Sequence, residues 1–263
     1  MYKLKIITLI FFLGCSATKM AFIDELQLKF DKGEQFYNSG KYTRAKDELQ
    51  YVVMNNPGSQ MALDAQYLLG ESHFELKEYE DAALEFDRFS RSSKSYDRIE
   101  SARSRICECY INMSNSFQKD QTSTLEAIDC LQEFIEDYSE FIDHYSTSTN
   151  VDAATKEISS LRLKLAKKEF ESARLYLKLE EYDSALIYLN SVLTQYYDTE
   201  IVDEVRLTIV FLYLLQNEVE LATSYLENQE AKFVSAEKLK ETQNLVSNMK
   251  NGLGLSEYIR LYK

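Results

Sequence analysis

One short pattern recurs five times along this chain and limits what the chain can fold into. In each copy an alanine is followed four residues later by leucine or phenylalanine, and tyrosine, threonine or valine stands three residues before it. Steps of three and four residues place these positions on one face of an α-helix. Antiparallel helices approach closely where one presents a small side chain, and a bulky residue one turn later fills the space beside it. The pattern therefore predicts a stack of helical hairpins. The alanines are Ala45, Ala82, Ala127, Ala185 and Ala222.

The clearest copy occupies residues 67–86 and reads Y-L-L-G-E-S-H-F-E-L-K-E-Y-E-D-A-A-L-E-F. Its L-G pair, followed by Ala82 and Phe86, resembles the tetratricopeptide pattern L-G-x₂-Y then A-x₃-F, with His73 where tyrosine is usual. This resemblance implies an all-α, superhelical solenoid of about five helical hairpins, in which each hairpin contacts only its neighbours.

The distances between copies predict where the solenoid is irregular. The alanines are 37, 45, 58 and 37 residues apart, whereas the usual repeat is about 34 residues long. We expect an insertion at Ser114–Gln121, a long helix from about Val151 to Glu180, and a polar-faced helix at Ala231–Lys250 that caps the stack. The solenoid would then span residues 26–250, with a loose tail at 251–263.

The first residues have the features of a secretory leader. Lys3 and Lys5 precede an apolar run at residues 6–13, and the small residue Gly14 stands at the position of cleavage. Spanning a bilayer takes about 20 apolar residues, so the run is too short to do so. Export of the chain follows from this interpretation.

Cys15 follows the leader directly, and F-L-G-C resembles the lipobox that marks bacterial proteins for lipid attachment. We expect residues 1–14 to be the signal peptide, Cys15 to carry the lipid, and residues 15–25 to form a tether. Because Ser16 rather than aspartate comes next, the resemblance implies passage to the outer membrane, facing the periplasm. The alternative is an ordinary signal peptide with a chance cysteine.

The charge of the chain excludes some partners. Its formal net charge is −13, and the leader contributes only lysines to that balance. Nucleic acid is therefore not an expected partner, and an anionic membrane surface would repel the protein. Acyl chains must supply the membrane attachment.

No group of residues predicts catalysis, a cofactor or a metal. The two histidines, His73 and His144, read as packing and loop residues, because a zinc or nucleophilic site needs several partners. Glycine-rich phosphate-binding motifs are absent from the sequence. Acidic pairs such as Glu180 with Glu181 fall at expected hairpin turns. We therefore expect a protein that is not an enzyme, and a lipid-anchored hydrolase is disfavoured.

Three cysteines follow the leader: Cys107, Cys109 and Cys130. If the third hairpin brings its helices together, Cys130 can pair with Cys107 or with Cys109. The two lie about 200° apart on a helix, so both cannot point at Cys130. Buried free thiols are the alternative.

The first helices of the hairpins offer a binding surface. Aromatic residues spaced between acids suit an extended peptide whose side chains need apolar pockets and whose amides need acceptors. The alternative is that these aromatics pack between hairpins. The candidates are Phe30, Glu34 and Tyr37 in the first copy, and Asp64, Tyr67, Glu71 and Phe74 in the second. A basic cluster, interpreted as a solvated face or a site for an acidic partner, contains Arg162, Lys164, Lys167 and Lys168.

Three segments carry a more specific resemblance. They are D-Q-T-S-T-L-E-A-I-D-C-L-Q-E-F-I-E-D-Y at Asp120–Tyr138, L-R-L-K-L-A-K-K-E-F-E-S-A-R-L-Y in the long helix, and Y-Y-D-T at Tyr196–Thr199. In this order they resemble the BamD (ComL/YfiO) family, lipoproteins of the outer-membrane β-barrel assembly machinery. The resemblance covers roughly Leu26 to Leu226, and no specific motif follows it.

That resemblance implies a scaffold whose N-terminal repeats receive unfolded outer-membrane proteins. Its C-terminal repeats would dock the barrel subunit BamA, alongside other Bam components. In this chain the helix pair at 201–228 is the expected docking region, with Asp203, Glu204 and Arg206 as exposed candidates. The alternative is another periplasmic tetratricopeptide lipoprotein, acting in envelope maintenance or pilus assembly.

Overall fold

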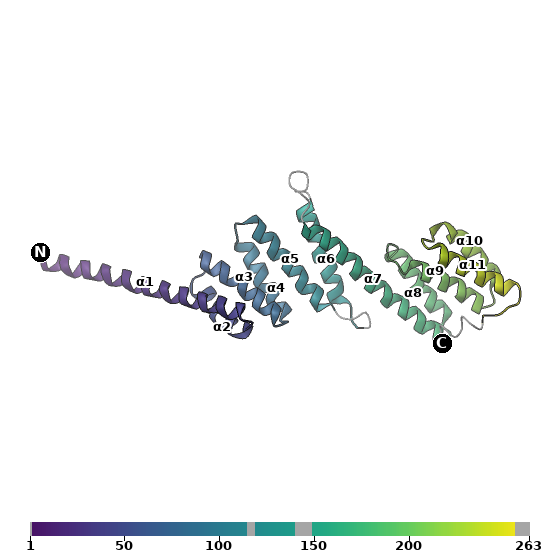
Figure 1. Cartoon of the computed structure of the whole chain (residues 1–263), viewed down its shortest axis with the longest axis horizontal. Coiled ribbons are helices and arrows are strands. Elements are labelled where there is room, and N and C mark those ends of the chain that lie inside the picture. The colour runs from purple at the N-terminus through teal and green to yellow at the C-terminus, as the bar shows by residue number, and fades with distance from the viewer. Residues whose placement is uncertain (1, 115–118, 140–148, 256–263) are drawn as a thin grey trace. The chain divides into compact units, whose positions relative to one another are not determined.

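The computed structural model describes residues 2–114, 119–139 and 149–255, with side chains from residue 20 onward except those of Ser139 and Thr149. These residues form eleven α-helices and one 3-10 helix, and they contain no strand (Figure 1). The expected all-α fold is confirmed. The helices are α1 (Tyr2–Asn38), α2 (Tyr42–Asn55), α3 (Gln60–Glu75), α4 (Tyr79–Ser92), α5 (Tyr96–Met113), α6 (Thr122–Ser139), α7 (Thr149–Lys178), α8 (Tyr182–Gln195), α9 (Val202–Leu215), α10 (Val219–Gln229), η2 (Glu230–Lys232) and α11 (Ala236–Lys250).

Five hairpins run from α1/α2 to α9/α10 in chain order, and α11 packs against α9 and α10. The repeat alanines are the contact points of the second helices: all five have no exposed surface. The leucine or phenylalanine four residues later is buried in every copy as well. The five-hairpin prediction is therefore confirmed in the part of the chain that the structure describes.

Four of the hairpins turn in the same way. The residue five positions before the repeat alanine has a positive φ, which ends the first helix of the hairpin. In the second hairpin the N–H of Lys77 donates to Phe74 O at 2.9 Å and the N–H of Glu78 donates to His73 O at 2.9 Å. This is the Schellman arrangement that closes a helix C-terminus. The four turn residues are Gly40, Lys77, Glu180 and Asn217.

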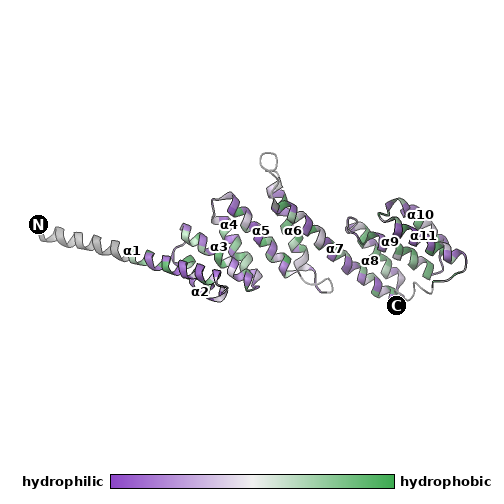
Figure 2. Cartoon of the chain, viewed as in Figure 1, coloured by the Kyte–Doolittle hydropathy of each residue, from purple (hydrophilic) through white to green (hydrophobic). Residues whose placement is uncertain are grey.

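The chain divides into two compact units. Unit 1 comprises residues 1–114 and 122–154, and unit 2 comprises residues 115–121 and 155–263. In unit 1 the glycine of the repeat pattern allows close helix contact: a Cβ added to Gly70 would lie 2.9 Å from the Phe86 ring. Figure 2 shows hydrophobic and hydrophilic stripes alternating around the helices of this unit. Its amphipathic helices therefore bury one face each.

The third hairpin of unit 1 is closed by a disulfide between Cys107 of α5 and Cys130 of α6, whose Cα atoms are 5.5 Å apart. Cys109 is free and buried beside Phe86. Burial raises the pKa of the Cys109 thiol to about 12. One of the two predicted pairings is thus confirmed, and the other cysteine packs on the opposite side of α5.

Unit 2 contains the long helix and the most deeply buried helix. Helix α7 is 30 residues long, within two residues of the expected boundaries at each end. Its Phe170 and Leu177 pack against Leu189 of α8 and Ile209 of α9. Helix α9 buries eleven of its fourteen residues, because α8, α10 and α11 all pack against it.

The C-terminal helix begins later than predicted. A break at 233–235 separates η2 from α11, so the expected single helix from Ala231 is wrong. Ser235 caps α11 by accepting the N–H of Lys238 at 3.3 Å, and a serine in this position favours a helix start. After α11, Leu255 is buried against the last helices, and the rest of the predicted tail, residues 256–263, lies outside the described residues. None of the described helices is long and apolar enough to span a membrane.

Candidate functional site

The second copy of the predicted binding surface forms one face of α3. Asp64, Tyr67, Glu71 and Phe74 follow one another at steps of three and four residues, so they lie along one side of the helix. All four are partly exposed. The structure therefore brings these predicted residues together.

Two arginines of α5 complete this face. The guanidinium of Arg98 lies 2.6 Å from a carboxylate oxygen of Asp64. The Nε of Arg105 donates to Glu71 at 2.9 Å, and its terminal nitrogens donate to Glu71 and Glu108. The carboxylates that we expected to accept peptide amides are thus already paired with arginines.

Arg105 is also the centre of an aromatic cluster. Its guanidinium lies 3.8 Å from the centroid of the Phe74 ring, close enough for attraction between the cation and the ring face. Phe74 in turn makes an edge contact with Tyr79, at 5.3 Å between ring centroids. One side chain therefore joins the charge pair to the aromatic surface.

Tyr67 lies on the same face and packs edge-on against Phe86 and Phe89, at 5.4 and 5.2 Å between ring centroids. Burial raises the pKa of the Tyr67 hydroxyl to about 12, and the negative charge of Glu71 adds to this shift. Tyr67 thus contacts the buried core on one side and lies beside the Glu71–Arg105 ion pair on the other. We define the aromatic–arginine surface as Tyr37, Tyr67, Phe74, Asp64, Glu71, Arg98 and Arg105.

The first copy contributes less to this surface. Phe30 and Tyr37 pack against the core shared by α1, α2 and α3, and Tyr37 makes an edge contact with Tyr42 at 5.6 Å between ring centroids. Glu34 is exposed. Phe30 and Tyr37 therefore pack between hairpins, as the alternative interpretation expects, and each also keeps some exposed surface.

Sequence reasoning missed Arg98 and Arg105, although a signal for them exists. Each arginine stands 34 residues after its acid partner, and this is about the length of one repeat. Residues one period apart lie side by side in consecutive hairpins. Two acids seven residues apart on the first helix of one hairpin therefore predict a pair of bridges when the first helix of the next hairpin carries two arginines seven residues apart.

The predicted docking residues in unit 2 have a different environment from the one expected. Asp203 and Arg206 are buried, so their expected exposure is wrong. The two form an ion pair at 2.8 Å, and Asp203 also accepts the backbone N–H groups of Val234 and Ser235 at 3.0 and 2.7 Å. The break before α11 folds over this part of α9 and removes it from solvent.

Glu204 is the most accessible of the three docking candidates. It is partly exposed and lies 2.7 Å from the ammonium of Lys238 on α11. Lys238 also contacts Glu241 at 3.0 Å. A charged patch of these three side chains therefore marks the surface where α9 meets α11.

The basic cluster of α7 is tied to other parts of unit 2. Arg162 donates to both carboxylate oxygens of Asp198, at 2.6 and 2.9 Å for its shortest contacts, and to Gln195 O at 2.7 Å. This hydrogen bonding lowers the pKa of the Asp198 carboxyl. Lys168 donates to Lys119 O at 3.0 Å. The arginine therefore holds the loop before α9 and is not free for an acidic partner.

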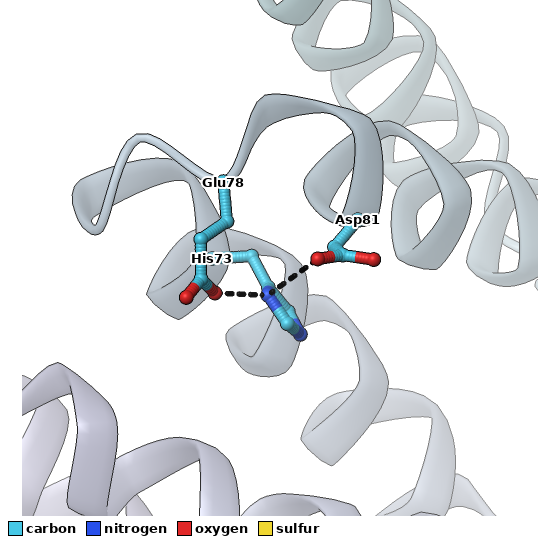
Figure 3. Close-up of side chains that lie close together, drawn as sticks. All are labelled: His73, Glu78 and Asp81. Atoms are coloured by element: carbon cyan, nitrogen blue, oxygen red, sulfur yellow. Dashed lines mark hydrogen bonds and ion pairs between the residues drawn. The ribbon is translucent and has the colours of Figure 1, made fainter.

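His73 lies at the turn of the second hairpin with two carboxylates. Figure 3 shows its ring between Glu78 and Asp81, with Nδ1 at 2.7 Å from Glu78 and 3.9 Å from Asp81. The three donor atoms are close enough to hold a metal ion. However, the ammonium of Lys46 already pairs with Glu78 and lowers the pKa of that carboxyl. We assign the cluster to closing the turn.

Two predicted residues lie where the structure gives no side-chain information. Cys15 belongs to the range of α1, but its side chain is outside the described residues. His144 lies outside them altogether. The lipidation of Cys15 remains a prediction.

The sequence model of the YfiO family, described as an outer membrane lipoprotein, matches residues 24–215. No curated protein matches the chain.

Among solved structures, the chain is similar to TPR-like repeats of a kinesin light chain from Podosopora anserina, with 12% identity over 79% of this chain and 93% of that one, at a TM-score of 0.38. A thermophilic TPR protein from Thermus thermophilus has 17% identity over 85% and 97%, at a TM-score of 0.33. A tetratricopeptide repeat protein from Parabacteroides merdae has 13% identity over 86% and 100%, at a TM-score of 0.31.

Proposed function

This chain belongs to the YfiO family of outer membrane lipoproteins, and we propose that it is a lipid-anchored, periplasm-facing scaffold of the β-barrel assembly machinery. It would bind unfolded outer-membrane proteins through unit 1 and a BamA-like barrel subunit, with other Bam components, through unit 2. It would catalyse no reaction. The observation that carries the proposal is the family match itself, which runs from the end of the tether through all of α9.

The aromatic–arginine surface is the proposed client site. Tyr37, Tyr67 and Phe74 offer partly exposed rings on which apolar side chains of an extended strand can pack. Arg98 and Arg105 hold their acid partners in place, so the polar groups of the surface are positioned before a client arrives. Such preorganisation lowers the entropy cost of binding.

The charged patch of Glu204, Lys238 and Glu241 is the proposed docking point for the barrel subunit. Asp203 and Arg206 would act from beneath it, because they hold the segment before α11 against α9. The family match ends at residue 215, before α10. Lys238 and Glu241, which α11 contributes to this patch, therefore lie outside the region that the family model matches.

Co-purification tests the scaffold proposal. The full chain, extracted from membranes in detergent, should bring down a BamA-like barrel protein. Glu204→Lys should weaken that recovery, because charge reversal disturbs complementarity at an exposed interface. Asp183→Lys, at an exposed acid on α8 outside the predicted docking helices, serves as the matched control. Recovery of a different envelope assembly without any barrel subunit would instead favour the envelope-maintenance or pilus alternative.

Client binding needs its own measurement. A peptide copy of the last strand of an outer-membrane protein should bind the full chain, and Phe74→Ala should weaken it. Since Phe74 also packs against Tyr79, a thermal melt must show that the variant is folded. Phe233→Ala, a partly buried aromatic in unit 2, is the control. Equal loss of peptide binding in both variants would contradict a client site in unit 1.

Lipid anchoring rests on Cys15. Cys15→Ala, expressed with its leader, should leave the outer membrane fraction and appear in the soluble fraction. A processed form that stays bound to membranes would disprove the anchor at this residue.

A further inference from the structure

Unit 1 contains a groove that the proposed client site does not use. It is an open depression of about 680 Å³ between α4 and α6, with α5 beneath it. Ligand-binding clefts in proteins measure about 300–1,000 Å³, so the groove is large enough to receive several side chains.

The groove and the aromatic–arginine surface lie on opposite sides of α5. Arg105 points toward α3, where it pairs with Glu71. Arg103 and Cys107, each two residues away, line the groove, and two residues correspond to about 200° around a helix. A partner in the groove would therefore not compete directly with a client strand.

The floor of the groove is apolar and fixed. Ile99 and Ile106 of α5 and Phe134 of α6 contribute hydrocarbon surface. The Cys107–Cys130 disulfide also lines the floor and joins its two helices covalently. The floor therefore offers burial for apolar side chains without a conformational change of its own.

The rim of the groove is negatively charged. Glu126, Asp129 and Glu133 line it from α6, and their spacing of three and four residues puts them along one side of that helix. All three are exposed, and within the described residues none of them has an ion-pair partner.

The two arginines of the groove do not balance these acids. Arg91 is paired with Asp87 at 3.0 Å, and Arg103 is paired with Asp137. Elsewhere in the unit, Asp64 and Glu71 of α3 are matched by arginines of α5. Glu126, Asp129 and Glu133 thus form the part of the groove where negative charge is not paired with a cation.

We propose that this groove binds a basic amphipathic helix of a partner protein. Glu126 and Glu133 are seven residues apart, about 10 Å along the helix axis. A partner helix that lies beside α6 can match this spacing. It does so when lysine or arginine stands at positions i, i+3 or i+4, and i+7 of its own sequence. Apolar residues on the same face then reach the floor, which is the helix-in-groove mode of recognition.

Peptide binding to the detergent-solubilised full chain tests this inference. The probe is a helical peptide of alanine, leucine and arginine with arginines at the spacing given above, and binding is followed by fluorescence anisotropy. The groove variant combines Glu126→Gln, Asp129→Asn and Glu133→Gln. It should lower the affinity about tenfold, since each unpaired acid contributes a modest attraction.

A matched variant separates the groove from overall charge. Asp47→Asn, Glu75→Gln and Glu80→Gln remove the same charge from exposed positions of unit 1 that do not line the groove. This variant should bind the probe nearly as the wild type does. Equal weakening by both variants would show that the peptide senses only net charge, and would overturn the inference.

The occupant's conformation is tested by two further peptides. A peptide of the same composition with its arginines scrambled off the helical face should bind weakly, and so should one that contains prolines and stays extended. Comparable binding by either peptide would contradict a helix in the groove. Ile99→Ala, with a thermal melt to confirm folding, should lower affinity for the probe, because Ile99 contributes floor surface. Unchanged affinity in that folded variant would contradict insertion into the floor.

Discussion

The two units use the same hairpin but stabilise it differently. In unit 1 neighbouring first helices are bridged at their exposed edge by Asp64–Arg98 and Glu71–Arg105, and the third hairpin is closed by a disulfide. In unit 2 helix α9 is surrounded by other helices and buries most of its length. A buried ion pair, Asp203–Arg206, lies inside this packing. A partly exposed charged surface thus remains in unit 1, whereas in unit 2 the Asp203–Arg206 pair fixes the fold and an accessible charged patch lies beside it at Glu204.

This difference shows that the position of a charge pair decides its energetic role. An exposed pair adds little stability, because water solvates both ions in the unfolded chain and screens them in the folded one. A buried pair is costly to break, because the remaining ion is left without water or a partner. The predictions below test this contrast, beginning with the substitution that should destabilise the protein most.

Asp203→Ala should lower the free energy of unfolding by about 3–5 kcal/mol, because Arg206 would remain buried and unpaired. Two backbone N–H groups would lose their acceptor as well. Asp64→Ala, which breaks the partly exposed pair of unit 1, should cost less than about 1 kcal/mol. Denaturant melts of both variants measure the difference. Similar losses would abolish the contrast between the units.

Replacing both Cys107 and Cys130 by alanine should lower the stability of unit 1 by about 3 kcal/mol, since the bridge closes a loop of moderate length. Hydrogen exchange should then accelerate in α5 and α6 and stay unchanged in α9. Reductant provides the control: it should destabilise the wild type and have no effect on the double variant. Faster exchange in α9 would show that the units are not independent.

Gly70→Ala should cost about 1–3 kcal/mol through overpacking, because the new Cβ would meet the Phe86 ring at 2.9 Å. The equivalent position of the fourth hairpin, twelve residues before its repeat alanine, already holds the fully buried Ala173. Ala173→Gly should cost about 1–2 kcal/mol through lower helix propensity and the loss of one buried methyl group. Thermal melts of the two variants measure these losses of stability. An unchanged melting temperature for Gly70→Ala would show that the Phe86 ring can move aside.

Lys77→Gly in unit 1 and Glu180→Gly in unit 2 should each stabilise the protein by about 1 kcal/mol, because glycine adopts positive φ without strain. Both residues have φ near the same value, 63° and 60°. Gly40→Ala, at the matching turn of the first hairpin, should have the opposite effect. Calorimetry measures the stability of all three variants. A stability gain in only one unit would mean that the positive φ shared by these turns does not determine the energetic cost of a non-glycine residue there.

Much of the fold was predictable because its contacts are periodic. The repeat alanines have fixed neighbours at three and four residues, so one face of each second helix follows from local spacing. The boundaries of α7 were predicted within two residues for the same reason. The start of α11 was not, because its cap at Ser235 depends partly on hydrogen bonds from the same segment to Asp203, more than 30 residues earlier.

The order of residues alone was enough to predict the hairpin register, the negative charge and the grouping of Tyr67, Glu71 and Phe74 on one helix face. Which charges remain accessible became clear only from the folded chain. Asp203 and Glu71 are both acids on first helices, yet one is buried under the segment before α11 and the other pairs with Arg105 at a partly exposed surface. Helical periodicity fixes the direction of a side chain relative to its own helix, whereas its solvation depends on distant segments that fold over it.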